Sequence, residues 1–134
     1  METSIYNAFV SAFVTKMISF TKVTQVSPFS ACFSSKGIGS TCFGSAVRQI
    51  YLALQSMSVY WSIHGENSMV EVSKDVVCLG FANGGMNTRT SIVIQGHQLE
   101  YNLLSFDIAT SRLGFRSSFL SHQATCLNFN FTSN

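Results

Sequence analysis

The sequence predicts a mostly β domain that begins with one long N-terminal helix, and three observations lead to this fold class. Apolar residues near the N-terminus recur at every fourth position, which is the spacing of one face of an α-helix. A loop rich in glycine and serine follows, and beyond it apolar and polar residues alternate, as in half-buried strands. With 134 residues, the chain has the size of a single domain.

The N-terminal helix is predicted from two neighbouring apolar rows that form one broad face. One row contains Ile5, Phe9, Phe13 and Met17, and the other contains Tyr6, Val10, Val14 and Ile18. Thr3 or Ser4 is the expected N-cap, because a short hydroxyl side chain accepts a hydrogen bond from a free N–H of the first turn. The β-branched residues lower the helix propensity, so the helix should depend on packing against the rest of the domain.

A loop and several short strands are predicted in the middle of the chain. Pro28, the only proline, lies in a serine-rich passage that runs into the glycine-containing loop CFSSKGIGSTCFG. Strands are expected at residues 50–54, 59–63, 69–72 and 76–81, and the turns between segments at His64-Gly65-Glu66-Asn67 and Asn83-Gly84-Gly85.

The segment TSIVIQGHQLEYNLLSFDIATSRLGF, residues 90–115, is predicted to contain three elements. Ile92-Val93-Ile94 is expected to be a fully buried strand that ends at Gly96, because its apolar residues are continuous. Residues 97–102 are expected to form a helical turn. Alternation over residues 104–108 and 113–115 predicts a hairpin closed by the turn Ala109-Thr110-Ser111-Arg112. The tail after Phe119 is predicted to be irregular.

The composition argues against nucleic acid and membrane as partners. Only 10% of the residues are charged, against about 25% in a typical soluble chain. The net charge is +2 and no Lys/Arg cluster is present to follow a phosphate backbone. The apolar start METSIYNAFVSAFVTK is interrupted by polar residues and is not a convincing signal peptide. No apolar run approaches the roughly 20 residues that span a bilayer.

The aspartates and histidines do not form a recognisable catalytic set. The only aspartates are Asp75 and Asp107, and neither lies in the D-[TS]-G turn that exposes a carboxylate for acid–base chemistry. Asp107 is instead expected to face solvent beside the hairpin turn. The histidines, at positions 64, 97 and 122, lie far apart and no G-x-S-x-G elbow accompanies them. Residues 39–44 are spaced like part of a P-loop, but Ser45 stands where lysine should follow, so a flexible loop is the better interpretation.

The cysteine spacing favours disulfides or buried thiols over a metal site. Cys32, Cys42, Cys78 and Cys126 include no C-x-x-C pair, and we expect no metal or other cofactor. Asn130 begins an N-glycosylation acceptor, Asn130-Phe131-Thr132. Cysteines and acceptor together indicate an oxidising compartment.

Five ordered segments resemble the C-terminal lobe of plant pepsin-like aspartic peptidase homologues. They are ETSIYNAFVSAF, PFSACFSS, VYWSIHGENSMVEVSKDVVCLGF, RTSIVIQGHQLEYNLLSFDIATSRLGF and TCLNFNFTSN. The resemblance covers residues 1–134 and is greatest to the branch that holds xylanase inhibitor proteins, the extracellular dermal glycoprotein and basic seven-S globulins. It implies that the domain is the C-terminal half of the bilobal acid-protease-like β-barrel fold. It also implies an extracellular or apoplastic location.

The resemblance implies that catalytic groups are missing from this chain. In full members of the family, each lobe supplies one D-[TS]-G aspartate to a dyad that activates water. The second of these motifs lies a short way upstream of the segment that matches ETSIYNAF, and the chain begins after it. We therefore expect no enzyme activity and a missing N-terminal lobe as the natural partner of this one.

Individual residues also match functional positions of the family. Cys32 and Cys78 match a pair that is bridged within the C-terminal lobe. Cys126 resembles a terminal cysteine that joins the N-terminal lobe, and would be unpaired here. Cys42 has no counterpart, so the pairing of Cys42 and Cys126 stays open. His122, four residues before Cys126, matches a histidine with which cereal xylanase inhibitors meet the catalytic carboxylates of a glycosidase; the alternative is an exposed tail histidine without a role.

Three functional hypotheses remain after these observations. The leading one is a non-catalytic lobe of an extracellular aspartic-peptidase-like protein that acts by binding a protein, with a microbial cell-wall-degrading glycosidase as the first candidate and another extracellular protein as the general case. The second is a fragment of an active aspartic endopeptidase whose N-terminal part is missing. The third is a truncated product without a function of its own.

Overall fold

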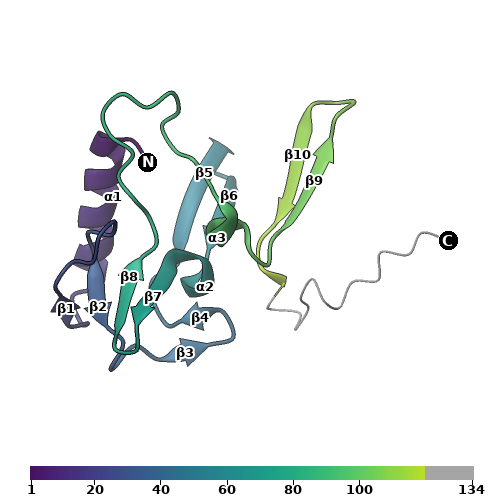
Figure 1. Cartoon of the computed structure of the whole chain (residues 1–134). Helices are drawn as coiled ribbons and strands as arrows, with labels where there is room; N and C mark the ends of the chain where they lie inside the picture. The colour runs from purple at the N-terminus through teal and green to yellow at the C-terminus, as the bar shows by residue number, and fades with distance from the viewer. Residues whose placement is uncertain (120–134) are drawn as a thin grey trace.

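The computed structural model describes residues 1–119, in which one helix lies beside a four-stranded sheet and three two-stranded ladders complete the fold. Figure 1 shows the helix α1 on one side of the sheet and the hairpin of β9 and β10 projecting from the opposite side of the molecule. The prediction of a mostly β fold with an N-terminal helix is confirmed. Within the described residues the strands form separate sheets and not one closed barrel.

The helix α1 runs from Thr3–Lys16 and is capped by Glu2, so the predicted cap at Thr3 or Ser4 is wrong. The Glu2 carboxylate accepts hydrogen bonds from the backbone N–H of Ser4, at 3.0 Å, and of Ile5, at 3.3 Å. The Ser4 hydroxyl donates to the same carboxylate and is the main reason why the pKa of Glu2 lies below its usual value. Thr3 is not free to cap, because its hydroxyl donates to the Asn83 side chain.

The buried face of α1 is narrower than the two predicted apolar rows. Tyr6, Phe13 and Met17 are buried, whereas Ile5 is 37% exposed and Ile18 is 88% exposed. Ile18 is exposed because the helix ends at Lys16, two residues earlier. The face that remains carries the aromatic rings that contact the sheet.

The central sheet has the strand order β1-β2-β8-β7 and is antiparallel throughout. Its strands are β1 (Lys22–Val23), β2 (Cys32–Ser34), β8 (Val76–Leu79) and β7 (Met69–Ser73). The α1 ring of Phe13 lies 6.4 Å from that of Phe33 on β2, in an edge contact. Phe9 likewise contacts Phe81, just beyond β8, with 4.9 Å between ring centroids. These contacts join the helix and the sheet in one hydrophobic core.

Three ladders extend the fold beyond the central sheet. They pair β3 (Ser40–Thr41) with β4 (Gly44–Ser45), β5 (Ile50–Ser56) with β6 (Val59–Ile63), and β9 (Leu103–Asp107) with β10 (Arg112–Arg116). The predicted strands at 50–54 and 59–63 and the predicted hairpin around residue 110 are thereby confirmed. The predicted turn at residues 64–67 is a short helix, α2 (Gly65–Ser68). Gly65 allows it to approach β4, since a Cβ at this position would collide with the Ser45 carbonyl.

The predicted buried strand Ile92-Val93-Ile94 is absent from the structure. The segment has no strand partner among residues 1–119, and Ile92 is 37% exposed and Val93 54% exposed. An apolar triplet forms a strand only where a neighbouring strand supplies its backbone hydrogen bonds. The predicted helical turn after it is confirmed as α3 (Gly96–Leu99), which begins one residue earlier than expected.

Candidate functional site

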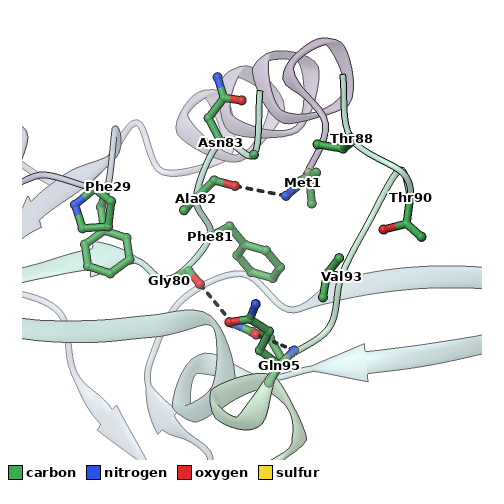
Figure 2. Close-up of a pocket in the computed structure, with 13 residues that line it drawn as sticks. Met1, Phe29, Gly80, Phe81, Ala82, Asn83, Thr88, Thr90, Val93 and Gln95 are labelled. Carbon is green, nitrogen blue, oxygen red and sulfur yellow. Dashed lines mark hydrogen bonds between the residues drawn. The ribbon is translucent and has the colours of Figure 1, made fainter. Parts of the chain in front are cut away.

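A cavity of about 430 Å³ lies between the N-terminus, the chain that leaves β8, and residues 88–95. Figure 2 shows Phe81, Val93 and Gln95 around it, with Met1 at its rim. Its other lining residues are Pro28, Phe29, Gly80, Ala82, Asn83, Gly84, Thr88, Thr90 and Gln98. None of the lining side chains carries a charge, and the Met1 ammonium at the rim is the one charged group of the lining. The cavity therefore holds no carboxylate or imidazole for acid–base chemistry.

Hydrogen bonds from the first three residues hold the rim of this cavity. The Met1 ammonium donates to the Ala82 carbonyl at 3.2 Å, as the dashed line in Figure 2 shows, and the Met1 carbonyl accepts from the Gly84 N–H at 2.7 Å. The backbone N–H of Glu2 donates to the Ser91 carbonyl at 2.8 Å. The start of the chain therefore joins the two walls of the cavity, which are otherwise irregular backbone.

Gln95 and Gln98 form a capping box that fixes α3 at the floor of the cavity. Gln95 is the N-cap, its side chain accepts from the Gln98 backbone N–H, and the Gln98 side chain accepts from the Gln95 N–H. The Gln98 amide also donates to the Gly80 carbonyl at 2.9 Å. The sequence signal for this capping box is a polar residue followed three positions later by glutamine. The capping box was not among the elements predicted from the sequence.

Two asparagines, Asn67 buried and Asn102 partly exposed, hold α3 from the other side, and the sequence did not predict this role for either. Asn67, only 1% exposed, donates from its side-chain amide to the carbonyls of His97 and Glu100, both at 2.9 Å. Asn102 accepts from the Trp61 indole N–H at 3.2 Å and donates to the carbonyls of Gln98 and Glu100. These bonds satisfy backbone carbonyls at the end of the helix, which would otherwise lack partners.

Neither aspartate reaches the cavity. Asp75, in the turn between β7 and β8, forms an exposed ion pair with Lys36 at 3.5 Å. Asp107 is exposed at the hairpin turn, as predicted, where its carboxylate accepts hydrogen bonds from the Thr110 hydroxyl at 2.6 Å and the Thr110 N–H at 3.1 Å. These bonds lower the pKa of Asp107 below its usual value. Asp75 thus pairs with a residue of another turn, the one after β2, and Asp107 with a residue of its own hairpin turn.

The two histidines of the described residues also have separate structural partners. His64 is partly buried and its ring stacks on Phe43, with centroids 4.6 Å apart and an angle of 17° between planes. A His97 ring nitrogen lies 3.2 Å from the Met69 carbonyl, and the other lies 3.8 Å from the Glu100 carboxylate. They do not form a Ser-His-Asp arrangement with Asp75 or Asp107. His122 lies outside the described residues.

The partial burial of His64 predicts that the domain loses stability at mildly acidic pH. Burial lowers the pKa of His64 below the usual value of 6.5, so the unfolded chain takes up a proton at higher pH than the folded one. The free energy of unfolding should therefore be highest above about pH 6.5 and should fall as the pH decreases through the lower folded-state pKa. Urea titrations at several pH values would measure this slope, and a His64→Gln variant should show a shallower one. An unchanged slope in the variant would contradict the prediction.

The cysteines are divided between a core disulfide and an exposed thiol. Cys32 and Cys78 occupy opposite positions on β2 and β8 and form a disulfide. Cys42, between β3 and β4, is exposed and is not in a disulfide within the described part of the chain. Cys126 and Asn130 lie outside that part, so their predicted roles stay predictions.

Residues 1–119 contain neither a cluster suited to a metal ion nor a helix suited to span a membrane. No group of three or more His, Cys, Asp or Glu residues in this range is arranged to hold a metal ion. No helix in the same range combines the length and the apolar character needed to cross a bilayer.

Fold and site together define a mostly β, disulfide-bridged domain with a cavity that no charged side chain lines. The family model described as "Xylanase inhibitor C-terminal" matches residues 1–117, and the chain belongs to this family. It is 56% identical over 133 residues to the "Probable aspartic proteinase GIP2" of Nicotiana benthamiana. The aligned region covers 99% of this chain and 30% of that protein.

Solved structures place the same fold within longer chains. The crystal structure of edgp matches with a TM-score of 0.93 and 55% identity, over 99% of this chain and 33% of that one. Conglutin gamma, described as a unique basic 7S globulin from lupine seeds, matches with a TM-score of 0.86 and 36% identity, again over 99% of this chain and 33% of the other. The chain thus spans about a third of the length of these relatives.

Proposed function

We propose that this chain is a non-catalytic C-terminal lobe of an extracellular aspartic-peptidase-like protein of the acid-protease fold, and that it acts by binding another protein. The observation that carries this proposal is the position of the two aspartates. Neither belongs to a D-[TS]-G motif, and both are held in exposed turns away from the cavity. Aspartic peptidase chemistry needs two carboxylates close enough to share a proton.

The cavity of Figure 2 is the proposed contact with the N-terminal lobe. Met1 lies at its rim, so polypeptide that precedes this residue in the longer relatives would enter there. No lining side chain is charged, and Val93 contributes to one wall from the apolar segment Ile92-Val93-Ile94, which pairs with no strand within residues 1–119. An additional extended segment would supply the hydrogen bonds that this wall lacks.

The proposed target is a microbial cell-wall-degrading glycosidase. Support comes from the match to the xylanase inhibitor C-terminal family and from His122, which occupies the position of the inhibitory histidine in the resemblance described above. An imidazole has a pKa near 6.5 and can bond or pair with the carboxylates of a glycosidase site.

A second candidate function is proteolysis by a longer protein that contains this lobe. It is favoured by the name of the Nicotiana benthamiana relative, a probable aspartic proteinase. In that case polypeptide outside this chain would supply both catalytic aspartates.

Titration of fungal xylanases and endoglucanases with the 134-residue chain would test the binding function. We expect saturable inhibition of at least one enzyme, and a loss of about tenfold or more in potency for His122→Ala, because an imidazole that meets buried carboxylates contributes about 1.5–3 kcal/mol. His64→Ala is the matched control and should inhibit like the unmodified chain.

Two outcomes would contradict parts of this proposal. Equal inhibition by the His122→Ala form would remove His122 from the contact while leaving inhibition itself intact. Pepstatin-sensitive cleavage of a protein substrate at acidic pH by the chain alone would overturn the non-catalytic assignment.

A further inference from the structure

A second cavity, of about 280 Å³, lies at the C-terminal end of α1 and shares no lining residue with the cavity of Figure 2. Two cationic side chains line it, Lys16 from the last turn of α1 and Arg48 from the segment between β4 and β5. Ser19, Phe20, Ala46 and Val47 complete its walls. Segments about thirty positions apart in the sequence therefore bring two of the eight Lys and Arg residues to one place.

Within the part of the chain that the structure describes, no acidic side chain balances the charge of this cavity. All six Asp and Glu residues lie within residues 1–119, and none of them lines the cavity. In the same range, the side chains of Lys16, Ser19 and Arg48 form no ion pair or hydrogen bond with another residue. Arginine and lysine only donate hydrogen bonds, so the site offers charged donors that have no acceptor among residues 1–119.

The walls behind these donors are apolar and held in place. Phe20 and Val47 are partly buried and pack against the hydrophobic core. The Phe20 N–H donates to the Met17 carbonyl at 3.0 Å, and the Val47 N–H donates to the Ser45 carbonyl at 2.7 Å. The cavity therefore combines a fixed apolar floor with a cationic rim.

We propose that this cavity binds a carboxylate attached to a small apolar body. The Arg48 guanidinium would receive the two carboxylate oxygens side by side, which is the geometry that arginine favours. Lys16 adds a second positive charge and Ser19 a neutral donor. The apolar part of the ligand would lie against Phe20 and Val47.

Isothermal titration of the full chain with benzoate at constant ionic strength tests the proposal, with benzamide as the uncharged analogue and acetate as the carboxylate without a ring. We expect saturable binding of benzoate, weaker binding of acetate and none of benzamide. Arg48→Gln should weaken benzoate binding at least tenfold, and Lys16→Gln at least threefold. Lys74→Gln, which removes the same charge at an exposed position outside the cavity, should stay within twofold of the unmodified chain.

An independent variant keeps the test sharp. Ala46→Glu places a carboxylate on the wall of the cavity, where it should compete with the ligand and abolish benzoate binding without removing either cation. Thermal unfolding of each variant will verify that it is folded. The proposal is overturned if benzoate does not saturate, if benzamide binds equally well, or if Lys74→Gln weakens binding as much as Arg48→Gln. Equal binding of acetate and benzoate would overturn the apolar part of the site.

Discussion

Replacing both core cysteines, as Cys32→Ala with Cys78→Ala, is expected to lower the free energy of unfolding by about 4 kcal/mol. The disulfide joins positions 46 residues apart, and a cross-link that closes a loop of this size restricts the unfolded chain strongly. It also joins β2 to β8 at the centre of the four-stranded sheet, where both cysteines are fully buried. Urea unfolding of the variant and of the unmodified chain under oxidising conditions would measure the loss.

Cys42→Ser is the matched control for this experiment. Cys42 is exposed on the turn between β3 and β4, so its replacement should change the free energy of unfolding by less than about 0.5 kcal/mol. Reduction of the unmodified chain with dithiothreitol should reproduce most of the loss seen in the double variant. If the double variant were as stable as the oxidised chain, the assigned importance of the cross-link would be wrong.

Asn67→Asp is expected to cost about 3–5 kcal/mol at neutral pH, although it changes the shape of the side chain very little. The Asn67 amide donates to the carbonyls of His97 and Glu100 from a position that is 1% exposed. An ionised carboxylate donates nothing and would face these two oxygens without solvent. The expected result is displacement of α3. This displacement should also break the hydrogen bond from Gln98 to the Gly80 carbonyl at the cavity of Figure 2.

The loss of folding stability in Asn67→Asp should depend on pH in a defined direction. Burial against carbonyl oxygens raises the folded-state pKa of the new carboxyl group above the value of about 3.9 in the unfolded chain. The variant is therefore least destabilised below about pH 3.9, where the protonated group donates one hydrogen bond, and loses stability as the pH rises through its folded pKa. Asn87→Asp at an exposed position should have almost no effect. A pH-independent loss in Asn67→Asp would contradict this explanation.

Elements whose partners are close in sequence were predicted well. The hairpin of β9 and β10 pairs Asp107 with Arg112 across a four-residue turn, and alternation together with turn residues identified it. The strands β5 and β6, which are also close in sequence, were likewise predicted from alternation. The strand predicted at residues 92–94 is absent, because a strand needs a pairing partner and continuous apolar character does not reveal whether one is present.

The candidate site could be predicted only in part, for a related reason. Sequence motifs excluded a D-[TS]-G dyad, and the structure placed Asp107 at the exposed turn where it was expected. Asn67 and Asn102 were missed because asparagine in a polar sequence resembles a turn residue. Only the fold shows that the Asn67 side chain is enclosed and that both side chains donate hydrogen bonds to carbonyls at the end of α3.

The sequence by itself determined the mostly β class, the N-terminal helix, the lack of a D-[TS]-G motif and, through ordered segments, the resemblance to a pepsin-like C-terminal lobe. These properties depend on local periodicity and on residue identity, both of which are written directly in the chain. The tertiary structure decided which face of α1 is buried, how α3 is held beneath the cavity of Figure 2, and that Lys16 and Arg48 line one cavity. Each of these depends on contacts between segments that are distant in sequence, and their geometry is fixed only when the hydrophobic core brings the segments together.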